Sequence, residues 1–411
     1  MPSDTRPAFS RPAISRPAIS RPAFSGPAFS RRRFLGSTAS VGAALGVAPL
    51  LGACGGDAAS SDASVDQSET DKSLVVSNWA LYIDTDRKGP DPFPTVARFE
   101  DETGIDVTYN EDITANTEFF AKIRPQLVKG SGVGRDLMVL TDWMAARLIR
   151  LGFVNEIDKS AIPNAKNLIP SLASPSFDPE RKYSMPWQSG FTSIAYNSNE
   201  VDQPVTSITE MLTRPDLAGR VAVFTEMRDT VGLVMLDQGA DPSDFTDEEF
   251  DAAIALLQDA TDSGHIRTFA DANYGQNLSK GNFAASMTYS GDINQLRADN
   301  PNLELVIPDS GFILWSDNML IPVGALHQSN AEEWMNFYYR PDVAADVAAW
   351  VNFITPVKGA KEELAKVDPG LANNELIFPS EEFLEQGSIF MALDEDTEMR
   401  YQAAFDGVRG L

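Results

Sequence analysis

The sequence predicts an α/β protein built from two lobes. Its 411 residues, 43% of them hydrophobic, are more than one compact core usually holds. From residue 74 onward, short apolar runs typical of strands alternate with patterns typical of helices. This alternation falls into two blocks on either side of residues 183–187. Such an order predicts parallel sheets with helices on both faces.

The first block contains three strand patterns, each followed by a helical pattern. Phe93, Val96 and Phe99 recur at helical spacing until Gly104, which is typical of a helix end. Strands are expected over 74–79, 105–109 and 136–140, and further helices over 119–127 and 143–151. The block therefore predicts a β-α-β-α-β-α order for the start of the first lobe.

The second block resumes after residue 190 and then returns to the first lobe. Thr246 and Glu249 have the spacing of a capping box and open a long helix. A second helix is expected to open at Ser329 and Glu332. Strands are expected over 193–196, 221–224, 285–289 and 303–307, and the return over 319–322. We expect one lobe over 74–189 plus 317–364 and the other over 190–316 plus 365–411, with a ligand cleft between them and two crossovers.

The N-terminal region carries signals for export and anchoring. Residues 6–30 repeat a basic, proline-containing unit of five residues, which predicts a disordered extension. Arg31 and Arg32 precede a short apolar run, as in a twin-arginine export signal. Cys54, the only cysteine, follows Leu-Gly-Ala as in a lipoprotein signal; the alternative is a plain signal peptide with an incidental cysteine. We expect 1–53 to be the signal region, 54–73 a flexible tether, and the protein to be lipid-anchored in the periplasm or at the outer face of the cytoplasmic membrane.

The charge of the chain excludes some partners. The seven arginines and one aspartate before Cys54 give +6, so the total of -26 leaves -32 on residues 54–411. This disfavours nucleic acid, whose phosphates attract basic surfaces. It suits either a protein that attracts cations or a generic acidic surface. One cysteine and two histidines cannot form a disulfide within the chain or a Cys/His zinc site. No metal or cofactor is therefore expected.

Aromatic and acidic residues follow several predicted strands. In α/β sheets, ligands bind beyond the carboxyl ends of strands and between domains. Aromatic faces attract organic ammonium groups and carboxylates bind them through charge-assisted hydrogen bonds. A single Trp there is more often a core residue, and Asp142 can be a helix cap. The residues concerned are Trp79, Tyr82, Thr141, Trp143, Glu226, Asp229, Tyr289, Asp292, Trp315 and Asp317. Their repetition predicts a site for a small organic cation.

Several segments resemble the spermidine/putrescine-binding proteins of bacterial ABC importers. They are Ser77-Asn78-Trp79 with Tyr82, and residues 99–108, 136–139, 183–186, 312–318 and 336–345. The resemblance implies a type II periplasmic-binding-protein-like fold and a monomer that delivers a polyamine to the permease subunits of an importer. The Asn-Trp start and the Trp-x-Asp sequence at 315–317 are its most specific parts.

The resemblance also implies roles for individual residues. Trp79 and Tyr82 would wall the cleft, Trp315 would stack on the alkyl chain and Asp317 would bind one ammonium. Glu226 and Asp229 would bind the other end. Trp143 replaces the family's usual tyrosine, and Tyr289 a frequent tryptophan. Phe353 and Ala80 replace a tyrosine and a threonine, so two hydroxyl groups are lost.

Two other classes of function remain open on the sequence alone. A protein of the same fold can bind another solute, such as a sugar, a metal or a different cation. A glycosidase-like enzyme can use paired carboxylates as acid and base. The sequence contains no nucleophile motif or cofactor loop that would favour an enzyme. We therefore expect a binding protein and no catalytic residues.

Overall fold

The computed structural model describes residues 65–86, 92–270 and 273–411. Arg31, Arg32, Cys54 and the tether up to residue 64 lie outside the described residues, so the export and anchoring predictions are not addressed by the fold. Within the described ranges, no helix is both long enough and apolar enough to cross a membrane.

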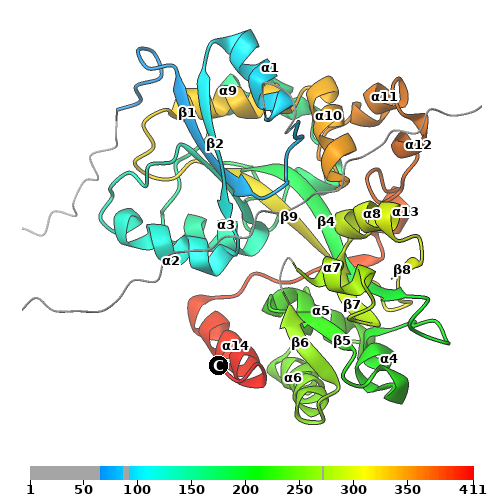
Figure 1. Cartoon of the computed structure of the whole chain (residues 1–411). Coiled ribbons are helices and arrows are strands. Elements are labelled where there is room, and N and C mark those ends of the chain that lie inside the picture. Colours follow the sequence, from blue (N-terminus) through cyan, green and yellow to red (C-terminus); the bar gives the residue numbers. More distant parts are fainter. Residues whose placement is uncertain (1–64, 87–91, 271–272) are drawn as a thin grey trace, which may run out of the picture. The chain divides into compact units, whose positions relative to one another are not determined.

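The described strands form one mixed sheet with the order β2-β1-β3-β9-β4-β7-β5-β6 (Figure 1). β10 pairs with β9, and β8 pairs with β4. The strands are β1 (Ser73–Trp79), β2 (Asp106–Ile113), β3 (Leu137–Thr141), β4 (Ser184–Asn197), β5 (Val221–Phe224), β6 (Ile266–Ala270), β7 (Ala285–Tyr289), β8 (Leu303–Val306), β9 (Phe312–Leu320) and β10 (Gly387–Ile389).

The sheet is parallel at its two ends and where the short strand β10 pairs with β9. β1 pairs in parallel with β2 and β3, and β5 with β6 and β7. Between these groups, β9 runs antiparallel to both β3 and β4, and β4 runs antiparallel to β7 and β8. The expectation of parallel sheets is therefore wrong for the centre, because the two long strands that join the ends run back across the molecule.

The predicted interruption near residues 183–187 is also wrong. Ser184–Gln188 belongs to β4, a 14-residue strand in which nearly every side chain is buried. A strand that is buried on both faces shows no alternation of apolar and polar residues. Its polar side chains, among them Gln188, Ser189 and Thr192, therefore left the first part of the strand unpredicted, whereas its end was predicted over 193–196.

Helices connect successive strands along the chain and pack around the sheet (Figure 1). The capping box at Thr246 and Glu249 is confirmed at the start of α6, and the helix expected from Ser329 begins one residue earlier. The helices are α1 (Pro94–Thr103), α2 (Asn116–Leu127), α3 (Asp142–Arg150), α4 (Ile208–Thr213), α5 (Met227–Asp237), α6 (Asp247–Asp262), α7 (Tyr274–Ser279), α8 (Ser290–Asp299), α9 (Gln328–Tyr338), α10 (Pro341–Val351), α11 (Ala360–Ala365), α12 (Pro369–Ala372), α13 (Glu381–Leu384) and α14 (Glu395–Val408).

Two large groups of buried side chains divide the fold into halves. We call β1–β3, the start of β4 and the end of β9 the first half; its buried side chains come from 74–187 and 319–372. The second half contains β5–β8, the end of β4 and the start of β9, with buried side chains from 194–313 and 390–408. Strands β4 and β9 lie side by side and connect the halves (Figure 1). The α/β fold of two lobes is thus confirmed.

A buried carboxylate of α14 joins the halves. Glu398 pairs with Arg228 of α5 and, at 2.8 Å, with Nη2 of Arg147 in α3. Helix α14 packs its Tyr401 on Phe250 of α6, with ring centroids 3.8 Å apart, so Glu398 belongs to the second half. Arg228 lies on α5 of the same half, whereas Arg147 lies on α3 of the first half. The ion pairs therefore cross between the two halves.

We expect Glu398→Gln to lower the free energy of unfolding by about 3–5 kcal/mol, because it leaves buried guanidinium groups without their carboxylate. Chemical denaturation followed by circular dichroism would measure this. Asp247→Asn is the matched control. It removes the carboxylate that pairs with Arg400, which lies on α14 like Glu398, and both side chains of this pair are about half exposed. The control should change the free energy of unfolding much less, because exposed ion pairs contribute little to stability. An equal effect of both variants would contradict a special role for Glu398.

Candidate ligand-binding site

The site begins at Asp317, in the middle of strand β9 where it leaves the second half for the first. The Tyr82 hydroxyl donates a hydrogen bond to Oδ2 of Asp317 at 2.9 Å. Oδ1 is buried and has no hydrogen-bond partner among the described residues. Thr141 lies opposite Asp317 in the β3–β9 ladder. Burial raises the pKa of the Asp317 carboxyl to about 7, and the nearby Asp142 charge adds to that effect. One carboxylate oxygen is therefore available to a buried donor.

A second buried carboxylate lies in the second half, in the first turn of α5. The Thr192 hydroxyl donates to Oδ1 of Asp229 at 2.8 Å, and the Tyr289 hydroxyl donates to Oδ2 at 3.2 Å. Burial raises the pKa of Asp229 to about 7, with a further contribution from the Glu226 charge. Like Asp317, Asp229 is a buried carboxyl that is hydrogen-bonded to neutral hydroxyl groups rather than to a cation.

A row of aromatic rings connects the two carboxylates. Tyr82 lies with its ring centroid 5.5 Å from Phe353, Phe353 lies 5.5 Å from Trp315, and Trp315 lies 5.6 Å from Tyr289. The row thus begins at the tyrosine bonded to Asp317 and ends at the tyrosine bonded to Asp229. Trp315 is fixed by a 3.1 Å hydrogen bond from its Nε1 to the Thr192 hydroxyl.

Two glycines allow the rings to approach the backbone. A Cβ atom on Gly190 would lie 2.6 Å from Cζ2 of Trp315, and one on Gly291 would lie 2.7 Å from the Phe353 ring. Real Cβ atoms do not come so close, so any larger residue would displace the rings. The aromatic row therefore depends on small residues in β4 and α8.

The arrangement suits a linear ligand with a positive charge at each end. Buried carboxylates bind ammonium groups through charge-assisted hydrogen bonds, and aromatic faces attract them further. Between the charges, flat rings pack against methylene groups. A neutral sugar would leave both carboxyls without a counter-charge in a buried place, which is unfavourable. The arrangement of the two carboxyls thus favours a ligand with two positive charges.

Three further predicted residues have different places in the structure. Asp292 accepts a hydrogen bond from the Tyr274 hydroxyl at 2.8 Å, and burial raises its pKa. Phe353, which replaces a tyrosine of the family, lies in the middle of the row and packs against Tyr82 and Trp315. Trp79 is half-buried at the end of β1, and its indole Nε1 is buried with no partner in the described part of the chain.

Trp143 and Glu226 both contact Arg228. The guanidinium of Arg228 lies 4.0 Å from the centroid of the Trp143 ring, and that of Arg147 lies 5.1 Å away. Glu226 caps α5 and pairs with Arg228 at 3.5 Å. The structure therefore does not bring Trp143 into the aromatic row, and its ring serves the chain's own cations.

Sequence reasoning missed Thr192, Gly190 and Gly291. Thr192 connects the two parts of the site, because it donates to Asp229 and accepts from Trp315. It follows Gly190-Phe191 in a strand without alternation, so no local pattern marked it. Gly291 lies between the predicted Tyr289 and Asp292. A glycine at this place, in the sequence Tyr-Ser-Gly-Asp, is the only local sign that a ring approaches the backbone there.

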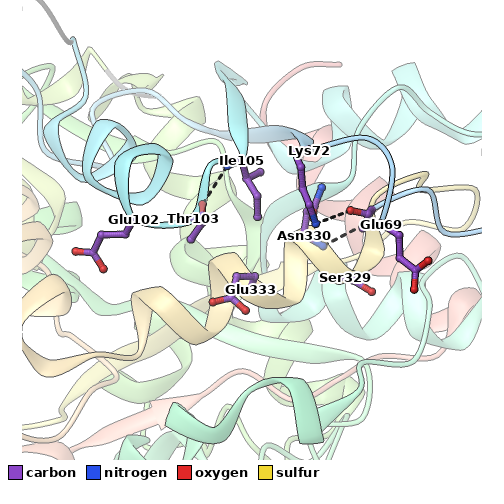
Figure 2. A pocket seen from close by; sticks show the side chains of 9 residues that line it. Glu69, Lys72, Glu102, Thr103, Ile105, Ser329, Asn330 and Glu333 are labelled. Atoms are coloured by element: carbon purple, nitrogen blue, oxygen red, sulfur yellow. Dashed lines mark hydrogen bonds between the residues drawn. The ribbon is translucent and has the colours of Figure 1, made fainter.

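A separate pocket of about 430 Å³ lies elsewhere in the first half. Figure 2 shows that its lining side chains come from the start of the described chain, from α1 and from α9. They include no aromatic ring, its three glutamates are exposed, and Lys72 donates to the Ser68 carbonyl at 2.7 Å. This pocket does not have the chemistry predicted for the site. In the described residues there is also no group of His, Cys, Asp and Glu side chains arranged to hold a metal ion.

Comparison with known proteins agrees with this chemistry. Residues 95–378 match the family described as bacterial extracellular solute-binding protein. A spermidine/putrescine-binding periplasmic protein of Salmonella typhimurium is 26% identical over 314 residues, covering 76% of this chain and 85% of that protein. A putrescine-binding periplasmic protein of Escherichia coli is 29% identical over 313 residues, covering 70% and 79%.

Solved structures show the same likeness. The spermidine/putrescine ABC transporter substrate-binding protein of Streptococcus pneumoniae superposes with a TM-score of 0.68 at 26% identity, covering 82% of this chain and 99% of that one. A lipoprotein of Treponema pallidum superposes with a TM-score of 0.70 at 24% identity, covering 82% and 100%. The resemblance on which the sequence analysis relied is thereby confirmed.

Proposed function

Because the chain belongs to the bacterial extracellular solute-binding protein family, we propose that it captures a linear polyamine outside the cytoplasm and delivers it to an ABC importer. The observation that carries the proposal is the aromatic row with a buried carboxylate at each end, Asp317 and Asp229. The names of the similar proteins, which bind spermidine and putrescine, support the same ligand class.

The proposed mechanism is capture between the halves. A cation binds to one half first, and the second carboxylate then reaches it as the halves close about β4 and β9. Closure removes water from both ammonium groups, which strengthens the charge-assisted bonds. No bond of the ligand is made or broken, so the proposed role is transport rather than catalysis. The related proteins are likewise transport proteins.

Anchoring at the membrane completes the proposal. Arg31 and Arg32 would direct export and Cys54 would carry the lipid. Acyl chains contribute about 0.8 kcal/mol per buried methylene, so a multiply acylated cysteine holds the protein stably at the membrane. The protein would act there as a monomer that meets the permease subunits of the importer.

A thermal-shift screen tests the proposed ligand class. Putrescine and spermidine should raise the melting temperature, because a ligand at a hundredfold excess over its Kd stabilises the folded state by about 2.7 kcal/mol. Glucose, glutamate and divalent metal ions should produce no comparable shift. Stabilisation by a sugar or a metal ion, with none by the amines, would replace the proposed function by that of another solute-binding protein.

We expect the affinity for a diamine to rise with pH between about 5 and 8. Burial raises the pKa of both Asp229 and Asp317 to about 7, and a bound ammonium favours their charged forms, so binding releases protons. Each carboxyl then weakens binding by up to about tenfold per pH unit below its pKa. Calorimetric titrations in two buffers of different ionisation enthalpy would measure the released protons. Equal heats in both buffers at pH 7 would contradict this expectation.

The stability of the ligand-free protein should change in the opposite direction. A carboxyl with a raised folded-state pKa stabilises the fold fully below its unfolded-state pKa of about 3.9, and this contribution is lost as the pH rises through 7. These two carboxyls therefore make the ligand-free fold relatively less stable at pH 8 than at pH 5. The increase in melting temperature caused by putrescine should consequently be larger at pH 8.

A further inference from the structure

Asp142 accepts hydrogen bonds from the residues on both sides of Asp317. Although it opens α3, it does not cap that helix: the cap position belongs to Thr141, and both Asp142 oxygens are used on strand β9. Its Oδ2 accepts from the backbone N–H of Ser316 at 3.0 Å, and its Oδ1 accepts from Nδ2 of Asn318 at 2.7 Å. Ser316 and Asn318 are the residues immediately before and after Asp317.

A buried arginine supports this connection from behind. Arg181 donates from Nη1 to Oδ1 of Asn318 at 2.7 Å, and its Nε donates to the Leu172 carbonyl at 3.0 Å. Its backbone has φ of 50°, a left-handed conformation that costs energy for a residue with a side chain. Asn318 therefore has both ends of its amide occupied and cannot turn away from Asp142.

The charges around this pair of carboxyls are few. Arg181 is the cation that acts on Asp142, and it does so through Asn318 rather than by direct contact. Tyr82 faces Asp317 from the segment after β1, and Thr141 faces it from β3. Two further titratable side chains, Tyr338 of α9 and Asp292 of α8, act electrostatically on Tyr82. Burial raises the pKa of Asp142 to about 6.

We propose that Asp142 is a positioning residue of the ligand site, which fixes Asp317 in β9 and makes its charge depend on the arrival of a cation. This inference rests on the proposed function and adds its regulation. Asp142 and Asp317 are both buried, and the charge of Asp142 makes Asp317 harder to ionise while the site lacks a cation. A bound ammonium then replaces a proton at Asp317. The site would therefore load at neutral and higher pH and unload in acid.

The direct test is Asp142→Asn, which keeps the size of the side chain and removes its charge. The pH at which putrescine affinity falls to half its maximum should move down by about one pH unit, the scale of a neighbouring charge. Asn318→Ser is the companion variant, because it breaks the bond to Asp142 and leaves the charge in place. It should weaken putrescine binding without moving the midpoint down. Glu332→Gln, which removes a buried first-half carboxylate bonded to Asp158 and Gln328, should change neither quantity.

A second readout separates this inference from the proposed function. The titration of the Asp317 carboxyl carbon by NMR, in the ligand-free protein, should show a lower pKa in Asp142→Asn than in the wild type. An unmoved Asp317 titration would overturn the inference, whether or not polyamines bind. If that pKa falls as expected while the wild type binds no polyamine, the role of Asp142 stands and the proposed ligand class fails. A loss of affinity in Asp142→Asn with an unchanged pH midpoint would reduce Asp142 to a purely structural residue.

Discussion

Asp317→Asn is expected to weaken putrescine binding by about thirtyfold to several thousandfold. Truncating one partner of a buried, hydrogen-bonded charge pair costs about 2–5 kcal/mol. Asp317 fits this description, because it is buried, its Oδ2 is held by Tyr82 and its Oδ1 has no partner in the described structure. The asparagine keeps the shape of the side chain but cannot neutralise an ammonium. Isothermal titration calorimetry at pH 8, where Asp317 is charged, would measure the change.

The control for this variant is Glu332→Gln. Glu332 is a buried carboxylate of the first half that accepts from the backbone of Asp158 and from Gln328, outside the aromatic row. It should bind putrescine like the wild type. Putrescine affinity within threefold of wild type in Asp317→Asn, with the fold intact by circular dichroism, would remove Asp317 from the site.

Asp229→Asn is expected to remove most of the advantage of a diamine over a monoamine. In the wild type, putrescine should bind far more tightly than butylamine of the same chain length, because each of its ammonium groups meets one carboxylate. In the variant, the Asp229 end offers only the Thr192 and Tyr289 hydroxyls around a neutral amide. The ratio of the two affinities should fall by at least tenfold, while butylamine held at Asp317 changes little.

This comparison of two ligands in two proteins isolates the charge at one end of the site. General loosening of the fold would weaken both amines equally and leave their ratio unchanged. An unchanged ratio in Asp229→Asn would therefore show that the second ammonium lies elsewhere, with Glu226 as an alternative carboxylate. Its pairing with Arg228 makes Glu226 the weaker candidate.

Local sequence patterns predicted the regular parts of the fold. The strand at 285–289 and the capping box of α6 emerge as expected, because amphipathic spacing and caps are encoded by neighbouring residues. α5 was not predicted, since Met227 to Met235 are all buried and no polar face interrupts them. The strand predicted over 193–196 is the end of β4, and the first part of β4 was missed for the same reason. Patterns of alternating apolar and polar residues do not detect helices and strands that are buried on every side.

The site was predicted unevenly for a related reason. Tyr82 and Tyr289 lie at strand ends as predicted, whereas Trp315 and Asp317 lie within β9 rather than after a strand; the structure brings all four together. Trp143 satisfied the same rule, yet its ring lies under Arg228, which is 85 residues away and belongs to the other half. Contacts made across the two halves depend on how distant segments meet. No spacing along the chain records them.

Calorimetric titration of the wild-type protein with putrescine and spermidine at pH 8 tests the central claim most directly. We expect saturable binding of one amine per chain at pH 8 and, when the titration is repeated at pH 7, proton release that is smaller in Asp317→Asn because only Asp229 then contributes. No saturable heat from either amine up to about 1 mM, where binding would be worth only about 4 kcal/mol, would contradict the account.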